Sequence, residues 1–260
     1  MSPAGKTPVP SRWRRQCLGW CVHFYTALGL VAAAAIAVLL VQGGMEAYRR
    51  IFLLMVVATL IDATDGTFAR WVRVKEVLPG FDGRRLDDLV DFLTYTCLPL
   101  LLVWRARLLP TNCEVVLLLP LLASAYGFCQ TSVKTDDGYF LGFPSYWNLV
   151  AFYLYVLQPL PTWFTLGVVV VFALLTFVPS RYLYPSQRGQ LNRVTNLLGV
   201  LWTLLLILII WNMPDGSTRA LAMASLFFPA WYLAASWIIS VRLWRRKRRG
   251  RRERMKAVLS

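Results

Sequence analysis

Four aspartates occur in a part of the chain that is otherwise strongly apolar. Asp62 and Asp65 interrupt one apolar stretch, and Asp87 and Asp91 lie in the first turns of the next. The spacings are i,i+3 and i,i+4, so each pair shares one helix face. Carboxylate oxygens are hard ligands that favour Mg²⁺ or Mn²⁺ over zinc, and the four together have room for one or two ions. The pattern predicts a divalent-metal site.

Small residues and one arginine accompany these acids. Gly66, Ala69 and Arg70 follow on the same stretch as Asp62, and Gly83 precedes Asp87 by four positions. Positions without bulky side chains let a ligand approach the backbone, and an arginine can hold two phosphate oxygens at once. The alternative for the small residues is ordinary packing between membrane helices. Their register with four acids favours a binding site.

The elements that must position these residues are apolar helices. Hydrophobic residues make up 57% of the 260, only 16% are charged, and the mean hydropathy is +0.53. This composition excludes a soluble globular domain and indicates an all-α polytopic membrane protein. We expect about eight transmembrane helices, at Trp20–Val41, Arg50–Val72, Leu86–Trp104, Cys113–Gln130, Trp147–Leu157, Thr162–Val178, Val194–Trp211 and Leu221–Trp244.

The basic residues predict the orientation. An even number of spans places both termini on one side, and that side holds 23 of the 28 lysines and arginines. Cytoplasmic loops carry this excess, so both ends are expected in the cytoplasm. Residues 1–19 form a basic tail, 20–244 a membrane-embedded domain and 245–260 a polybasic tail. The net charge of +15 is then explained by the cytoplasmic basic residues, which attract anionic lipid headgroups. No nucleic acid partner is expected.

The string from Asp62 to Asp91 resembles the signature of the CDP-alcohol phosphatidyltransferase family. It reads Asp-x2-Asp-Gly-x2-Ala-Arg-x12-Gly-x3-Asp-x3-Asp and fixes eight of thirty positions. The twelve-residue spacer before Gly83 is longer than in most members. It is similar to the spacer in the bacterial branch that uses choline, as are the eight-span layout and the loop from Lys134 to Asn148. The resemblance covers most of the chain, excluding the tails.

The resemblance implies an activity and a place. The enzyme would transfer the phosphatidyl group of CDP-diacylglycerol to choline and release CMP. It would work as a homodimer in the bacterial inner membrane, with its active site on the cytoplasmic side and Mn²⁺ or Mg²⁺ as cofactor, two ions being expected. The implied metal ligands are Asp62, Asp65, Asp87 and Asp91, with Asp91 also the general base. The implied CDP-diacylglycerol contacts are Gly66, Ala69, Arg70 and Gly83.

Choline recognition has its own candidates. A quaternary ammonium has no N–H donor, so proteins hold it with aromatic faces and nearby negative charge. The loop before the fifth expected span offers such groups: Asp136, Asp137, Tyr139, Tyr146 and Trp147. The alternative is an aromatic belt at the membrane interface.

Two other functions remain open from the sequence. A sibling enzyme would use serine, glycerol phosphate or inositol as the acceptor alcohol. A cation transporter would also carry acids within the membrane, but these are expected in both symmetric halves of the chain. Here the four acids all lie between Asp62 and Asp91, which favours the enzyme.

Overall fold

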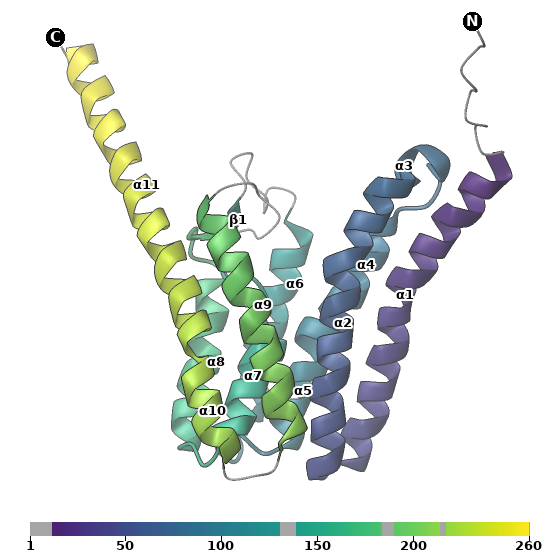
Figure 1. Cartoon of the computed structure of the whole chain (residues 1–260). Coiled ribbons are helices and arrows are strands. Elements are labelled where there is room, and N and C mark those ends of the chain that lie inside the picture. Colours follow the sequence, from purple (N-terminus) through teal and green to yellow (C-terminus); the bar gives the residue numbers. More distant parts are fainter. Residues whose placement is uncertain (1–11, 131–138, 184–189, 214–216, 260) are drawn as a thin grey trace, which may run out of the picture.

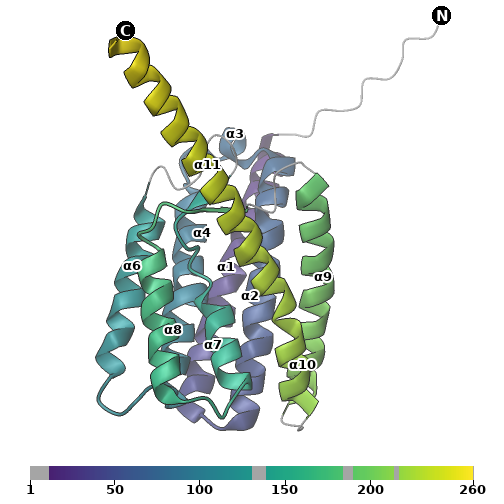
Figure 2. The same ribbon diagram turned by 90° about the vertical axis from the view of Figure 1, so that its left-hand side faces the viewer.

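The computed structural model describes residues 12–130, 139–183, 190–213 and 217–259, which form a bundle of helices running up and down (Figures 1 and 2). The elements are α1 (Arg12–Gln42), α2 (Met45–Val72), α3 (Val74–Val77), α4 (Gly83–Asp91), η1 (Phe92–Cys97), α5 (Leu98–Arg105), η2 (Glu114–Leu117), α6 (Leu118–Cys129), β1 (Tyr139–Leu141), α7 (Trp147–Val156), α8 (Thr162–Leu175), β2 (Arg181–Leu183), α9 (Gln190–Trp211), α10 (Ser217–Ser225) and α11 (Phe227–Leu259).

The helices follow the apolar segments expected from the sequence. Four helical stretches are long and apolar enough to cross a membrane: Trp13–Gln42, Met45–Val72, Val194–Trp211 and Thr218–Arg242. Three shorter apolar helices are Glu114–Cys129, Trp147–Val156 and Thr162–Leu175. The start of α1 and the end of α11 lie at the same end of the bundle, and α11 continues as one helix beyond its neighbours (Figure 1).

The third expected span is one continuous helical rod, built from α4, η1 and α5. Its middle, Phe92–Cys97, is a π-helix, and Pro99 follows at the start of α5. Proline has no N–H to give to the carbonyl four residues earlier and its ring crowds that carbonyl. A widened turn before Pro99 accommodates both problems. The rod therefore carries Asp87 and Asp91 just before an irregular turn.

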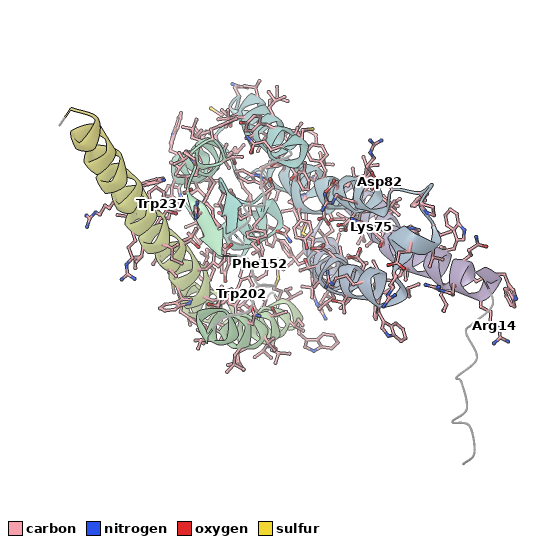
Figure 3. All side chains as sticks on the ribbon, turned by 90° about the horizontal axis from the view of Figure 1, so that it is seen from above. Arg14, Lys75, Asp82, Phe152, Trp202 and Trp237 are labelled. Atoms are coloured by element: carbon pink, nitrogen blue, oxygen red, sulfur yellow. The ribbon has the colours of Figure 1, made fainter. Side chains whose placement is uncertain are left out.

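The core lies between α2, α5, α7 and α9. Phe52 and Phe152 meet edge to face with ring centroids 5.2 Å apart. Polar groups inside this region are paired: the Trp202 indole donates to the Tyr153 hydroxyl at 2.9 Å, and that hydroxyl contacts Ser225 Oγ at 2.8 Å. Figure 3 shows Phe152 and Trp202 among the packed helices, and Arg14, Lys75 and Asp82 on the side formed by α1, α3 and α4.

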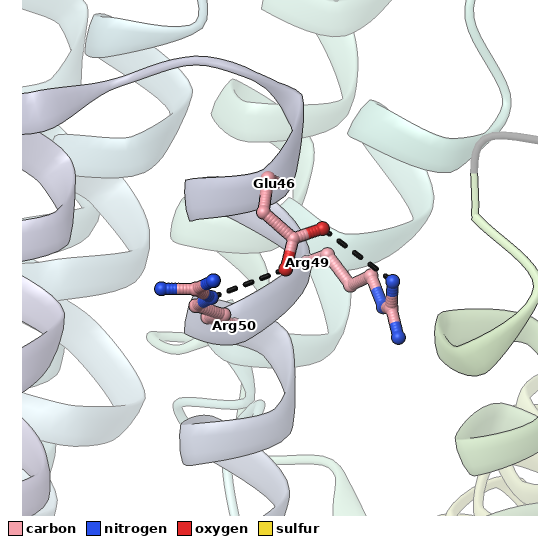
Figure 4. A network of polar contacts seen from close by, with 3 residues as sticks. All are labelled: Glu46, Arg49 and Arg50. Atoms are coloured by element: carbon pink, nitrogen blue, oxygen red, sulfur yellow. Dashed lines mark hydrogen bonds and ion pairs between the residues drawn. The ribbon is translucent and has the colours of Figure 1, made fainter.

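Charged side chains pair at the surface at the beginning of α2. Glu46 in the first turn accepts from Arg49 at 3.4 Å and from Arg50 at 3.1 Å (Figure 4). An acid there also complements the positive end of the helix dipole. The Arg49 guanidinium lies 5.3 Å from the centroid of the Trp211 ring, which joins the start of α2 to the end of α9.

A short antiparallel pair of strands departs from the all-helical expectation. β1 and β2 pair through Tyr139 with Leu183 and Leu141 with Arg181. Ser240 of α11 holds β2 in place, since its hydroxyl accepts from the Arg181 amide at 2.6 Å. The sequence did not predict this pairing because about forty residues separate the strands.

Candidate active site

Three carboxylates from two helices converge. Asp62 comes from α2, and Asp87 and Asp91 come from α4. One oxygen from each lies within 4.8 Å of the other two, and all three residues are half-buried. The structure thus confirms the predicted meeting of these acids. The i,i+4 spacing on α4 aims both of its aspartates at the same side of α2.

Asp65 lies beside this trio and is held from α1. It is only 6% exposed, and the Thr26 hydroxyl donates to its Oδ2 at 2.8 Å. Its carboxylate also lies close enough to Asp87 for the two to interact electrostatically. A buried carboxylate requires such donors, because leaving its oxygens unsatisfied costs several kcal/mol. All four predicted acids therefore belong to one cluster.

Close packing of α1 places the two acid-bearing helices. A side chain at Gly29 would collide with Val90 of α4, and one at Gly19 would come within 2.8 Å of Leu78. A second hydrogen bond, between Tyr25 and Thr64 at 2.8 Å, joins α1 to α2. Small residues let membrane helices approach in this way. The first helix thus packs against both acid-bearing helices and fixes their positions.

The start of α4 is fixed by capping. The Asp82 side chain accepts from the amides of Arg84 and Arg85 at 3.2 and 3.4 Å. Because an N-cap aspartate satisfies free amides at a helix start, it fixes where α4 begins. Gly83 follows, and a side chain there would collide with the His23 ring of α1. The lack of a side chain at Gly83 therefore allows α1 to pack closely against the start of α4.

The long spacer that departs from most of the family has a structure of its own. It contains α3, which begins after Arg73 in the left-handed backbone conformation with φ of 55°. Val74 of α3 is buried. The spacer thus contains a short turn of helix between the two acid pairs.

The other CDP-diacylglycerol candidates lie on the turn after Asp65. The Cβ position of Gly66 meets only the end of the Arg70 side chain, at 3.3 Å. Arg70 is exposed and donates to the Thr67 hydroxyl at 3.0 Å, and Ala69 is half-buried. The backbone beside Gly66 is therefore covered by a flexible guanidinium, which a phosphate can attract.

The choline candidates fall into separate groups. Asp136 and Asp137 lie outside the described residues, and the backbone of Tyr139 begins β1. Tyr146 is half-buried, with its ring centroid 6.3 Å from that of Tyr232. Trp147 is 1% exposed and its indole donates to Ser124 at 2.9 Å, so its contacts are those of a core residue.

One buried tyrosine at the cluster was not predicted. The Tyr95 hydroxyl donates to Asp62 Oδ2 at 2.8 Å. Tyr95 lies four positions after Asp91, which is the spacing of residues on one helix face. That spacing is the signal that could have found it. The family signature ends at Asp91, so attention to the motif alone passes over this residue.

The cluster suits a divalent cation by its donor set. All of its side chains offer oxygen, which Mg²⁺ and Mn²⁺ prefer. The separation within 4.8 Å lets one ion contact several of them, since metal–oxygen distances are about 2.0–2.6 Å. Such a site can bridge the oxygens of a diphosphate.

Comparisons with known proteins bear on the identity. No protein-family model matches the chain. It is 34% identical over 230 residues to a phosphatidylcholine synthase of Pseudomonas aeruginosa, covering 88% of this chain and 92% of that protein. It is 32% identical to that of Borreliella burgdorferi, covering 80% and 86%. It is 39% identical to that of Bradyrhizobium diazoefficiens, covering 71% and 68%. The chain belongs to the phosphatidylcholine synthase family.

Proposed function

We propose that this protein makes phosphatidylcholine by transferring the phosphatidyl group of CDP-diacylglycerol to choline, with release of CMP. The observation that carries the proposal is the cluster of Asp62, Asp65, Asp87 and Asp91 in a chain of this family. The chain is an enzyme, a transferase, and its spacing pattern supports its membership of the wider CDP-alcohol phosphatidyltransferase family.

The four aspartates would hold two Mn²⁺ or Mg²⁺ ions, and these ions would neutralise charge on the diphosphate. Asp91 is the proposed base. Its carboxylate takes the proton of the choline hydroxyl while the hydroxyl oxygen forms a bond to the phosphorus that bears the lipid. The bond from that phosphorus to the oxygen of CMP breaks, and CMP leaves with the electron pair.

CDP-diacylglycerol would lie along the turn from Gly66 to Arg70. Gly66 and Ala69 leave the backbone accessible to the nucleotide, and the Arg70 guanidinium can leave Thr67 to bind phosphate oxygens. Gly83 would affect substrate binding indirectly. Its lack of a side chain lets the His23 ring pack against it and so sets the distance between α1 and α4.

The acceptor is tested with one experiment. Purified protein receives CDP-diacylglycerol, Mn²⁺ or Mg²⁺, and labelled choline, serine, glycerol phosphate or inositol in parallel reactions. We expect labelled phosphatidylcholine and stoichiometric CMP with choline alone. Efficient use of serine would show that serine is the acceptor and choline is not. The absence of lipid product with every alcohol would overturn the proposed function.

Choline would bind near the start of α7. Tyr146 is a half-buried aromatic residue there, and Asn148, two residues on, approaches Thr59, one turn before Asp62. The α7 start is therefore next to the cluster. Asp136, Asp137 and Tyr139 would complete the site, and Trp147 would support it from the core through Ser124.

Tyr146→Leu is expected to raise the KM for choline about two- to thirtyfold, because one cation–π contact is worth about 0.5–2 kcal/mol. The KM for CDP-diacylglycerol should stay within about twofold, since other groups bind that substrate. Steady-state kinetics with each substrate varied separately measures both. Trp163→Leu, at the start of α8, is the control and should change neither constant. Equal increases in both constants would show that Tyr146 only supports the fold.

The proposed position is a bacterial inner membrane crossed eight times, with the cluster toward the cytoplasm. Arg50 and Arg70 are twenty residues apart on α2, which corresponds to about 30 Å, the thickness of a hydrocarbon core. Asp65 then lies within reach of water on the Arg70 side. The start of α1 and the end of α11 are on that same side, where basic residues are expected.

A protease-cleavable tag after Ser260 tests this orientation. The tag should be protected in intact spheroplasts and cut in inside-out vesicles, and cleavage in spheroplasts would reverse the proposed topology. We also propose a homodimer, as the family resemblance implies. Chemical cross-linking in native membranes should give a species of twice the monomer mass.

A further inference from the structure

Tyr95 is a buried polar side chain at the aspartate cluster that the proposed reaction does not use. It is 9% exposed and lies in the π-helix η1, one turn beyond Asp91. Its hydroxyl donates to Asp62 Oδ2 at 2.8 Å. A hydroxyl buried among apolar helices is costly unless it is bonded, so this contact fixes both groups.

A second residue of α2 lies beside Tyr95, and the start of α7 approaches that residue. Thr59, one turn before Asp62 on α2, lies beside the Tyr95 hydroxyl. The Asn148 amide approaches Thr59 Oγ1 at 3.5 Å, and Asn148 itself is buried at 7% exposure. Tyr95 therefore lies where α2, η1 and the start of α7 meet.

The irregular turn explains how Tyr95 comes to this place. In η1 the helix is wider than an α-helix, and Pro99 follows it. Thr94 and Thr96, on either side, are buried at 2% and 0% exposure. Such π-turns are frequent at functional sites because they redirect single side chains.

We propose that Tyr95 is a positioning residue that orients the Asp62 carboxylate for metal binding. An ionised carboxylate has two oxygens and about four acceptor sites, so it can accept from Tyr95 and also ligate an ion. With the bond in place, the carboxylate cannot turn freely about its terminal torsion. Partners that orient metal ligands in this way typically contribute a factor of about 10–100 in metal affinity or activity. This inference rests on the metal site of the proposed function.

The test compares Tyr95→Phe with the unmodified full-length protein in detergent. Free Mn²⁺ is followed by its electron paramagnetic resonance signal in a titration without substrate, so that binding is measured apart from turnover. We expect Tyr95→Phe to bind Mn²⁺ about 10–100-fold more weakly. The Mn²⁺ concentration for half-maximal turnover should rise by the same factor, and kcat should recover to within about threefold at saturating Mn²⁺.

Tyr153→Phe is the matched control. It removes a buried hydroxyl that bonds Ser225 and the Trp202 indole, away from the aspartates. We expect it to lower thermal stability without changing Mn²⁺ affinity. Thr59→Val is a second variant, at the residue of α2 beside Tyr95, for which we expect a several-fold weakening of Mn²⁺ binding. It decides the question if Tyr95→Phe does not fold.

The outcomes separate this inference from the proposed function. Unchanged Mn²⁺ affinity in a folded Tyr95→Phe, with normal binding by the unmodified protein, overturns the positioning role alone. The same conclusion follows if Thr59→Val is the only folded variant and it binds Mn²⁺ normally. An unmodified protein that binds no Mn²⁺ overturns both this role and the metal site.

Discussion

Replacing any one of the four clustered aspartates by asparagine is expected to lower turnover at least about a hundredfold. The change keeps the shape of each side chain and removes its charge, at Asp62, Asp65, Asp87 or Asp91. A hundredfold loss corresponds to about 2.7 kcal/mol of transition-state stabilisation, which is typical for one electrostatic group at a reacting phosphate or carbonyl. The measurement is steady-state turnover of each purified variant with CDP-diacylglycerol and choline.

Asp88→Asn is the control for this series. Asp88 lies on α4 between the two ligands but is outside the trio that shares an oxygen-lined site. We expect its turnover to stay within about threefold of normal, because helix faces turn by roughly 100° per residue. Gel filtration establishes that each variant is folded. Near-normal turnover in any of the four cluster variants would remove that residue from the site.

Removal of divalent cations is expected to abolish turnover. Carboxylates this close repel one another unless cations or protons intervene, and no reaction at a diphosphate proceeds easily beside uncompensated negative charge. Exhaustive chelation followed by the choline assay measures the effect. Adding back Mn²⁺ or Mg²⁺ should restore turnover, and Zn²⁺ should restore less because it prefers nitrogen and sulfur ligands.

Retention of full turnover after chelation, verified by elemental analysis of the protein, would contradict the metal site. The same preparation can be tested for substrate binding by fluorescence of a labelled CDP-diacylglycerol. Loss of turnover with binding retained would place the ions in the chemical step more than in capture of the lipid.

The sequence predicted the acid cluster because helix periodicity is local. The separations from Asp62 to Asp65 and from Asp87 to Asp91 each define a helix face, and two adjacent antiparallel helices bring such faces together. The structure confirms the meeting of Asp62, Asp87 and Asp91. The apolar segments were found for the same reason, since each depends only on a run of neighbouring residues.

Contacts between distant residues were beyond this kind of prediction. The pairing of β1 with β2, the α3 turn inside the spacer and the bond from Tyr95 to Asp62 depend on how helices pack. Gly83 shows the same limit: its type indicated a close approach, and only the structure shows that His23 is what approaches. The chemical roles of the site residues stay predictions until the variants are measured.

The hydrogen bonds on the two sides of α2 form at different times as the chain enters a bilayer during synthesis. Asp65 and Thr64 take partners from α1, which leaves the ribosome first, so an inserting hairpin of α1 and α2 already provides for them. Asp62 takes its bond from Tyr95, in the rod made afterwards. An intramembrane aspartate costs about 2.5–3.5 kcal/mol on insertion scales. The hydrogen bonds of the α2 aspartates are therefore completed in two stages, that of Asp65 once α1 and α2 are both inserted and that of Asp62 once Tyr95 has followed.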